Sequence, residues 1–182
     1  TICLEIGSYD ISAPLTINNP QSLKIRGQGW RTLLVGSQPG PVIAAQGGIG
    51  LTLENFTIVG VGASDSVSAM IDARNIADLN CLRLNILAVP VPDRPASAIS
   101  LTGLHLRTRI RECVLAAQVC IRGPSLNSES YLLSAEMDIS GNVLVAERAG
   151  VSMGDACLHF GTLRIAENLL LANPDFGISM RG

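Results

Sequence analysis

Three arginines alternate along one short segment, Arg107-Thr-Arg109-Ile-Arg111. Alternate residues of a β-strand point to the same side, so a strand here predicts a single cationic stripe. Guanidinium groups bind carboxylates, and such a stripe is suited to an acidic polysaccharide. Arg83 belongs to the same set of candidate ligand-binding residues.

The same arginines also have a purely structural interpretation. If two further strands follow in register, Arg107 lies beside Glu136, Arg109 beside Asp138, and Asp138 beside Arg164. Cross-strand ion pairs of this kind on an exposed sheet contribute about 0.2–1 kcal/mol each. Arg83 and Arg111 have no acidic partner in this register, so ion pairing and ligand binding are compatible.

Other residue types offer less chemistry. Trp30 and Tyr131 are the strongest candidates for stacking on a sugar ring. Asp65, Asp72 and Asp93 could converge at loops on one side of the molecule and serve in acid–base catalysis or bind calcium.

Cysteine and histidine give no sign of a metal site or a cofactor. The two histidines are far apart in the sequence, and no Cys-x-x-Cys motif occurs. We therefore expect no bound metal and no cofactor, and we interpret the cysteines as small buried hydrophobic residues. The cysteines are Cys3, Cys81, Cys113, Cys120 and Cys157.

Composition excludes several classes of protein. Of 182 residues, 47% are hydrophobic and 15% are charged, which excludes a disordered chain. The 13 basic residues nearly balance the 15 acidic ones, which argues against a nucleic-acid partner. No apolar run is long enough to span a membrane. With 18 glycines and only 3% aromatic residues, the core is expected to consist of thin aliphatic layers.

Short apolar segments recur along the whole chain. Each has an aliphatic residue, two variable residues, a fourth residue that is usually an amide, and then two or three apolar residues. Successive fourth residues are 27, 30, 28, 29 and 26 positions apart. A second series of short apolar segments falls between them, from Pro41-Val-Ile-Ala to Gly177-Ile-Ser-Met. The fourth residues of the first series are Gln28, Asn55, Asn85, Cys113, Asn142 and Asn168.

This repeat predicts an all-β fold, a parallel solenoid of about six coils with three short sheets. Neighbouring coils would lie about 4.8 Å apart, the spacing of strands in any sheet. Stacked amides satisfy one another by hydrogen bonding, so we expect a structural ladder along one turn of the solenoid. Its expected members are Asn55, Asn85, Asn142 and Asn168.

The start of the chain resembles a known family. Residues 2–17, including Gly7-Ser-Tyr9, and residues 23–34, including Gly27-Gln-Gly29 and Thr32-Leu-Leu, are similar to the first coils of right-handed parallel β-helix proteins of the pectin-lyase-like superfamily. The resemblance implies a single-stranded right-handed parallel β-helix over residues 1–182. It also implies an extracellular or cell-surface location. The superfamily contains lyases, glycosidases and esterases, but also non-catalytic scaffolds, and its polygalacturonase and pectate-lyase signatures are absent here.

Two functions follow as expectations. The first is a non-catalytic β-helical scaffold or weak polysaccharide-binding module of a larger surface or extracellular protein. The alternative is a pectate-lyase-like or glycosidase-like enzyme that acts on an acidic polysaccharide. The chain begins directly in a strand and ends after one without a capping helix. We therefore expect a longer β-helix, or association with another chain end to end or along a strand edge.

Overall fold

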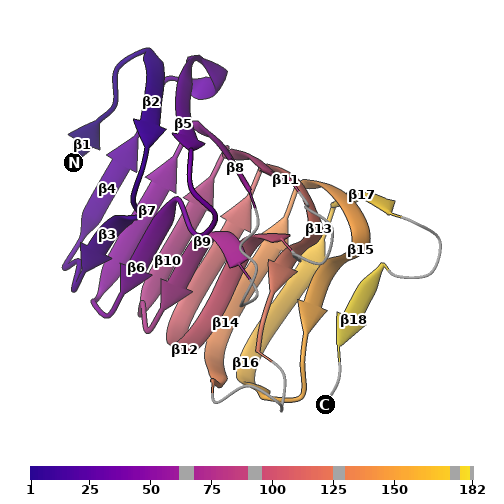
Figure 1. Cartoon of the computed structure of the whole chain (residues 1–182). Coiled ribbons are helices and arrows are strands. Elements are labelled where there is room, and N and C mark those ends of the chain that lie inside the picture. Colours follow the sequence, from indigo (N-terminus) through magenta and orange to yellow (C-terminus); the bar gives the residue numbers. More distant parts are fainter. Residues whose placement is uncertain (62–67, 90–95, 125–129, 173–176, 181–182) are drawn as a thin grey trace.

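The chain forms a parallel β-solenoid, as expected from the repeat. The computed structural model describes residues 1–61, 68–89, 96–124, 130–172 and 177–180. Successive coils stack along one axis from the N-terminus to the C-terminus (Figure 1). The only helical element in these residues is one 3-10 turn, η1 (Gly29–Arg31). None of them forms a helix that is long and apolar enough to cross a bilayer.

Each coil passes through three faces, which we call A, B and C. Face A stacks the strands β1 (Ile2–Cys3), β4 (Leu23–Arg26), β7 (Gly50–Glu54), β10 (Asp78–Leu82), residues 103–111 of β12 (Ala96–Arg111), β14 (Leu132–Ser140) and β16 (Cys157–Ala166).

Face B stacks the strands β2 (Gly7–Ile11), β5 (Thr32–Gly36), β8 (Thr57–Val61), β11 (Asn85–Val89), residues 114–117 of β13 (Val114–Arg122), residues 143–146 of β15 (Val143–Met153) and β17 (Leu169–Ala172). Face C stacks the strands β3 (Leu15–Asn18), β6 (Ile43–Gln46), β9 (Ser68–Arg74), residues 96–102 of β12, 119–122 of β13, 149–153 of β15, and β18 (Ile178–Met180).

The solenoid has about five turns, slightly fewer than the six expected, and the strands at its two ends are short. β1 has two residues and β18 has three. Between the ends, every described pair of stacked strands is parallel, and β12, β13 and β15 bend from one face to another.

The core consists of aliphatic side chains that stack on the same position of the next coil. One column on face C runs from Ile43 through Ile71, Ile99 and Ile121 to Val151, all with 0% exposure. Cys81, Cys113 and Cys120 are buried in this core as expected, whereas Cys3 is exposed. Burial raises the pKa of the Cys113 and Cys120 thiols to about 12, so both are protonated at neutral pH.

The turn from face A to face B is two residues long in each of the later coils. Its first residue has a left-handed backbone, with φ between 51° and 67°. The five residues at this position are Asn55, Arg83, Glu112, Gly141 and Glu167. Since only one of them is Gly and one Asn, the repeated hydrogen bonds between coils enforce this backbone rather than residue preference.

The amide ladder occupies the second residue of this turn and has two asparagines. Asn142 Nδ2 donates to Asn168 Oδ1 at 2.9 Å, and Asn142 Oδ1 accepts from the backbone N–H of Cys113 at 2.9 Å. The expectation of a four-asparagine ladder is wrong for Asn55 and Asn85. The register places Asn55 one position before this column and Asn85 one position after it. In these two coils the column itself contains the buried residues Phe56 and Leu84.

A second left-handed position lies at the turn from face C to face A. It alternates asparagine and glycine along Asn19, Gly47, Asn75 and Gly103. A Cβ at Gly103 would lie 2.1 Å from Asn75 Oδ1, which itself accepts from the backbone N–H of Leu104 at 2.9 Å. The asparagine of one coil therefore requires a glycine in the next, both for backbone conformation and for space.

Replacing Asn142 tests the ladder. Asn142→Ala removes the partners of the Cys113 N–H and the Ile110 carbonyl, both of which Asn142 contacts at 2.9 Å. We expect a loss of about 2–4 kcal/mol in the free energy of unfolding, because buried polar groups lose their hydrogen bonds. The control Asn85→Ala, whose amide makes one long contact of 3.4 Å, should lose less than about 1 kcal/mol in the same urea titration. Equal losses would contradict the register.

His105 predicts a pH dependence of stability. Its ring has 0% exposure, and Nε2 lies 3.0 Å from the Thr102 carbonyl. Burial lowers its pKa, although contacts with backbone carbonyls partly oppose this. The unfolded chain therefore binds a proton near the ordinary value of about 6.5 while the folded chain resists it, so stability falls as pH falls from about 6.5 toward 5. His105→Gln should abolish this slope in thermal unfolding, and His159→Gln, at an exposed position, should preserve it.

Candidate functional site

Face A brings the candidate arginines together, but each lies close to a carboxylate. Arg107 hydrogen-bonds to Asp78, and Arg111 to Asp138. The nearest carboxylate oxygen of Glu136 lies 3.9 Å from Arg109 Nη2. Face A is therefore a mixed surface of both signs rather than a free cationic stripe.

The expected register on face A is present, but some of the ion pairs are diagonal: Arg111 and Arg109 reach diagonal carboxylates, whereas Arg107 and Arg164 contact the aspartates directly opposite them. Arg107 lies opposite Glu136, Arg109 opposite Asp138, and Asp138 opposite Arg164. Long side chains reach diagonal neighbours on a sheet, so Arg111 contacts Asp138 although Ser140 is opposite it. The expectation that Arg111 lacks an acidic partner is therefore wrong.

Arg83 also has acidic partners, contrary to expectation. From its turn position it contacts Glu54 of the preceding coil and Glu112 of the following one, the latter at 3.4 Å. Lys24 contacts the other oxygen of Glu54, whose side chain is 6% exposed. The hydrogen bond from Lys24 is the largest effect on the pKa of Glu54, which is lowered despite burial.

Asp138 is the most enclosed acid of the remaining network. Burial raises its pKa, but hydrogen bonds from Ser140 and Arg111 and the positive charges of Arg111 and Arg164 hold it below the ordinary value. Arg164 Nη1 lies 3.5 Å away, and Arg164 also contacts Glu167 at 3.0 Å. The acidic and basic side chains of this cluster are therefore paired with one another across the sheet.

The other sequence candidates do not join these arginines in one site. Trp30, 74% exposed, belongs to η1 before β5, and the Arg31 guanidinium lies 5.6 Å from its ring centre. Asp72 on face C hydrogen-bonds to Arg74 at 2.7 Å. Asp65 and Asp93 lie outside the described residues. Within the described residues, no three His, Cys, Asp or Glu side chains are placed to hold a metal ion.

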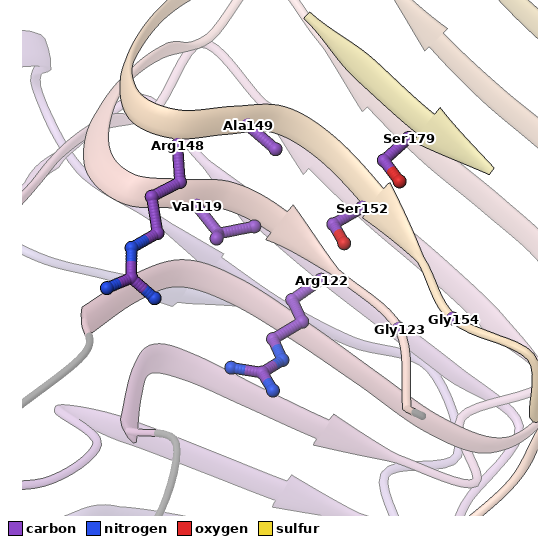
Figure 2. A pocket seen from close by; sticks show the side chains of 8 residues that line it. All are labelled: Val119, Arg122, Gly123, Arg148, Ala149, Ser152, Gly154 and Ser179. Atoms are coloured by element: carbon purple, nitrogen blue, oxygen red, sulfur yellow. The ribbon is translucent and has the colours of Figure 1, made fainter. Parts of the chain in front are cut away.

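A pocket of about 450 Å³ lies on face C across β13, β15 and β18 (Figure 2). Its floor includes Val119 and Ala149, which are paired across neighbouring coils. Ser152 is opposite both Arg122 and Ser179, so these three side chains line up along the axis. Small residues here leave room for a ligand beside the sheet.

Arg122 and Arg148 line this pocket and extend to the same side of it (Figure 2). Unlike Arg107, Arg109 and Arg111 on face A, neither has a carboxylate within 4.0 Å among the described residues. Burial lowers the pKa of the Arg122 guanidinium, and the positive charge of Arg148 lowers it further. Guanidinium groups carry a positive charge, and no acid among the described residues pairs with these two, so the described lining of the pocket has an excess of positive charge.

The sequence analysis missed these two arginines. Val119-Cys-Ile-Arg122 belongs to the second series of short apolar segments, and aligning it by sequence with the next member, Gly150-Val-Ser-Met153, is off by one residue. An irregularity between Ala117 and Val119 shifts the register, so that Arg122 lies opposite Ser152. When the alignment includes that shift, Arg122 falls among small outward-facing residues.

The comparisons with known proteins give no assignment: no protein-family model, curated protein or solved structure matches this chain.

The diagonal pairing on face A can be measured by double-mutant cycles. Arg111→Ala should cost about 1–2 kcal/mol, because Asp138 loses a hydrogen bond in an enclosed position. Arg109→Ala should cost less than about 1 kcal/mol, since Glu136 is distant and exposed. Arg111 should couple to Asp138 in urea unfolding, and Arg109 should not; coupling of Asp138 to Arg109 instead would contradict the structure.

Proposed function

We propose that this solenoid is a non-catalytic module that binds an acidic polysaccharide through the pocket on face C. The observation that supports this is the pair Arg122 and Arg148, two charged guanidinium groups beside one pocket without acidic partners among the described residues. An anion placed between them would relieve their mutual repulsion. The anion would also accept hydrogen bonds from the guanidinium groups, which lose hydrogen bonds to water when they are partly buried.

The lining of the pocket favours binding over catalysis. Ser152 and Ser179 add hydroxyl groups that donate to a carboxylate or sulfate or accept from a sugar hydroxyl. The described lining residues include no carboxylate, histidine or cysteine that could transfer a proton or attack a substrate. The proposed role is therefore recognition of a negatively charged chain by a rigid surface.

The class of ligand rests on the resemblance to the pectin-lyase-like superfamily. That superfamily's members include proteins that act on acidic polysaccharides and others that serve as scaffolds. The parallel solenoid agrees with the resemblance at the level of the fold. On the same basis we propose an extracellular or cell-surface setting within a larger protein.

Retention on immobilised polygalacturonate tests this proposal. Removing both charges in Arg122→Gln/Arg148→Gln should weaken binding at low salt at least tenfold, since a charged hydrogen bond contributes about 1.5–3 kcal/mol. The control Arg31→Gln/Arg109→Gln removes the same net charge elsewhere and should change retention by less than about twofold. Both double variants should unfold within about 1 kcal/mol of the wild type.

Two outcomes would overturn the proposal. Equal weakening by both double variants would show that net charge, not the pocket, governs retention. Release of unsaturated products from polygalacturonate or alginate, followed by ultraviolet absorbance, would show an enzyme of the lyase class.

A further inference from the structure

Face B has an outward surface without ionisable side chains. From β5 to β17 its strand segments are residues 32–36, 57–61, 85–89, 114–117, 143–146 and 169–172, and none contains Asp, Glu, Lys, Arg or His. The pairing between coils aligns the outward residues in two columns. One column contains Val35, Val59, Leu87, Ala116, Val145 and Leu171, and the other contains Leu33, Thr57, Asn85, Val114, Val143 and Leu169.

These side chains are accessible. Leu87 is 45% exposed, Val145 41% and Leu171 52%, although their neighbours Ile86, Leu144 and Ala88 on the same strands are buried. The alternation shows that β-strand geometry, not a local distortion, places them outside. A continuous surface of this kind, uncharged and mostly apolar, marks an interaction site.

The charge on the other faces restricts what can cover face B. Face A carries the arginine and carboxylate network, and face C carries Asp72, Arg74, Arg122 and Arg148. A partner surface with such charges would lose hydration against face B without gaining an ion pair. Among the residues that the structure describes, the part of face B from β5 to β17 is the flat surface that is free of charge, so a second copy of it is the matching partner.

We propose that two copies of this chain associate through face B, sheet against sheet, about a twofold axis. Two apolar sheets pack face to face about 10 Å apart, and a twofold interface places the same surface on both partners. Asp10 at the N-terminal end of face B and Glu147 at the corner after residue 146 are exposed and form a polar rim. The pocket on face C remains open in this arrangement.

The dimensions predict a weak dimer. Five steps between β5 and β17 at about 4.8 Å, and strands about 16 Å long, give a surface of ~400 Å² on each copy. Stable interfaces bury about 800 Å² on each partner, so association is expected in the micromolar range.

Leu87 lies in the middle of the uncharged outward surface of face B, near the expected twofold axis, and its side chain is exposed. The 182-residue chain should shift from monomer to dimer between about 1 and 200 µM in sedimentation velocity. Leu87→Lys should be monomeric over this range without a change in thermal unfolding. The control Leu106→Lys, at a residue that is 50% exposed in the face A segment of β12, should dimerise like the wild type.

A mixing experiment identifies the partner as a second copy. Leu87→Lys and Leu87→Glu should each be monomeric, and an equimolar mixture should form a heterodimer, because opposite charges then meet at the axis. A monomeric wild type at 200 µM would overturn the proposal. Dimerisation that Leu106→Lys abolishes, or that Leu87→Lys leaves intact, would also overturn it, since the contact would then lie on another face or at an end. Polysaccharide retention is a separate measurement, so failure of either proposal leaves the other testable.

Discussion

Backbone hydrogen bonding between coils at the turn from face A to face B is the constraint on which the remaining structure depends. The N–H of Asn55 donates to the carbonyl of Leu82, and the N–H of Arg83 donates to that of Arg111 in the next coil. Two residues later the direction reverses, and the N–H of Asn85 donates to the carbonyl of Phe56 in the preceding coil. A turn of constant length, fixed on both sides, keeps faces A and B in register from coil to coil.

Where the register is constant, a column of residues keeps one environment along the axis, so each face acquires its own character. On face A, arginines and carboxylates lie within reach of each other on successive coils. The enclosed acids Glu54 and Asp138 are each paired with basic side chains. On face B the same geometry stacks valine and leucine without a charge. On face C small residues surround two arginines. The proposed association and the proposed ligand binding therefore lie on different faces from the ion pairs of face A.

The fold could be read from the sequence because the aliphatic repeat reports the core directly. The turn could be read only in part. Asn142 and Asn168 share a column, but Asn55 has the left-handed position one residue earlier and Asn85 begins the next strand. The mean repeat length does not reveal such shifts of one residue, whereas a column of hydrogen-bonded side chains depends on them. The pocket depended on a shift of the same size at Val119, and the partners of Arg111 depended on diagonal reach that strand register alone does not encode.

Three of the described arginines, Arg111, Arg31 and Arg122, have different surroundings, and the difference argues for where a ligand would bind. Arg111 donates to an enclosed carboxylate, so an external anion would have to displace a partner already in place. Arg31 lies over the ring of Trp30, and its charge is partly balanced by that π-face. Arg122 instead faces a second positive charge, which burial makes more costly. An anion gains the most free energy where the protein has left the repulsion unrelieved, and among the described arginines that condition is met beside the pocket on face C.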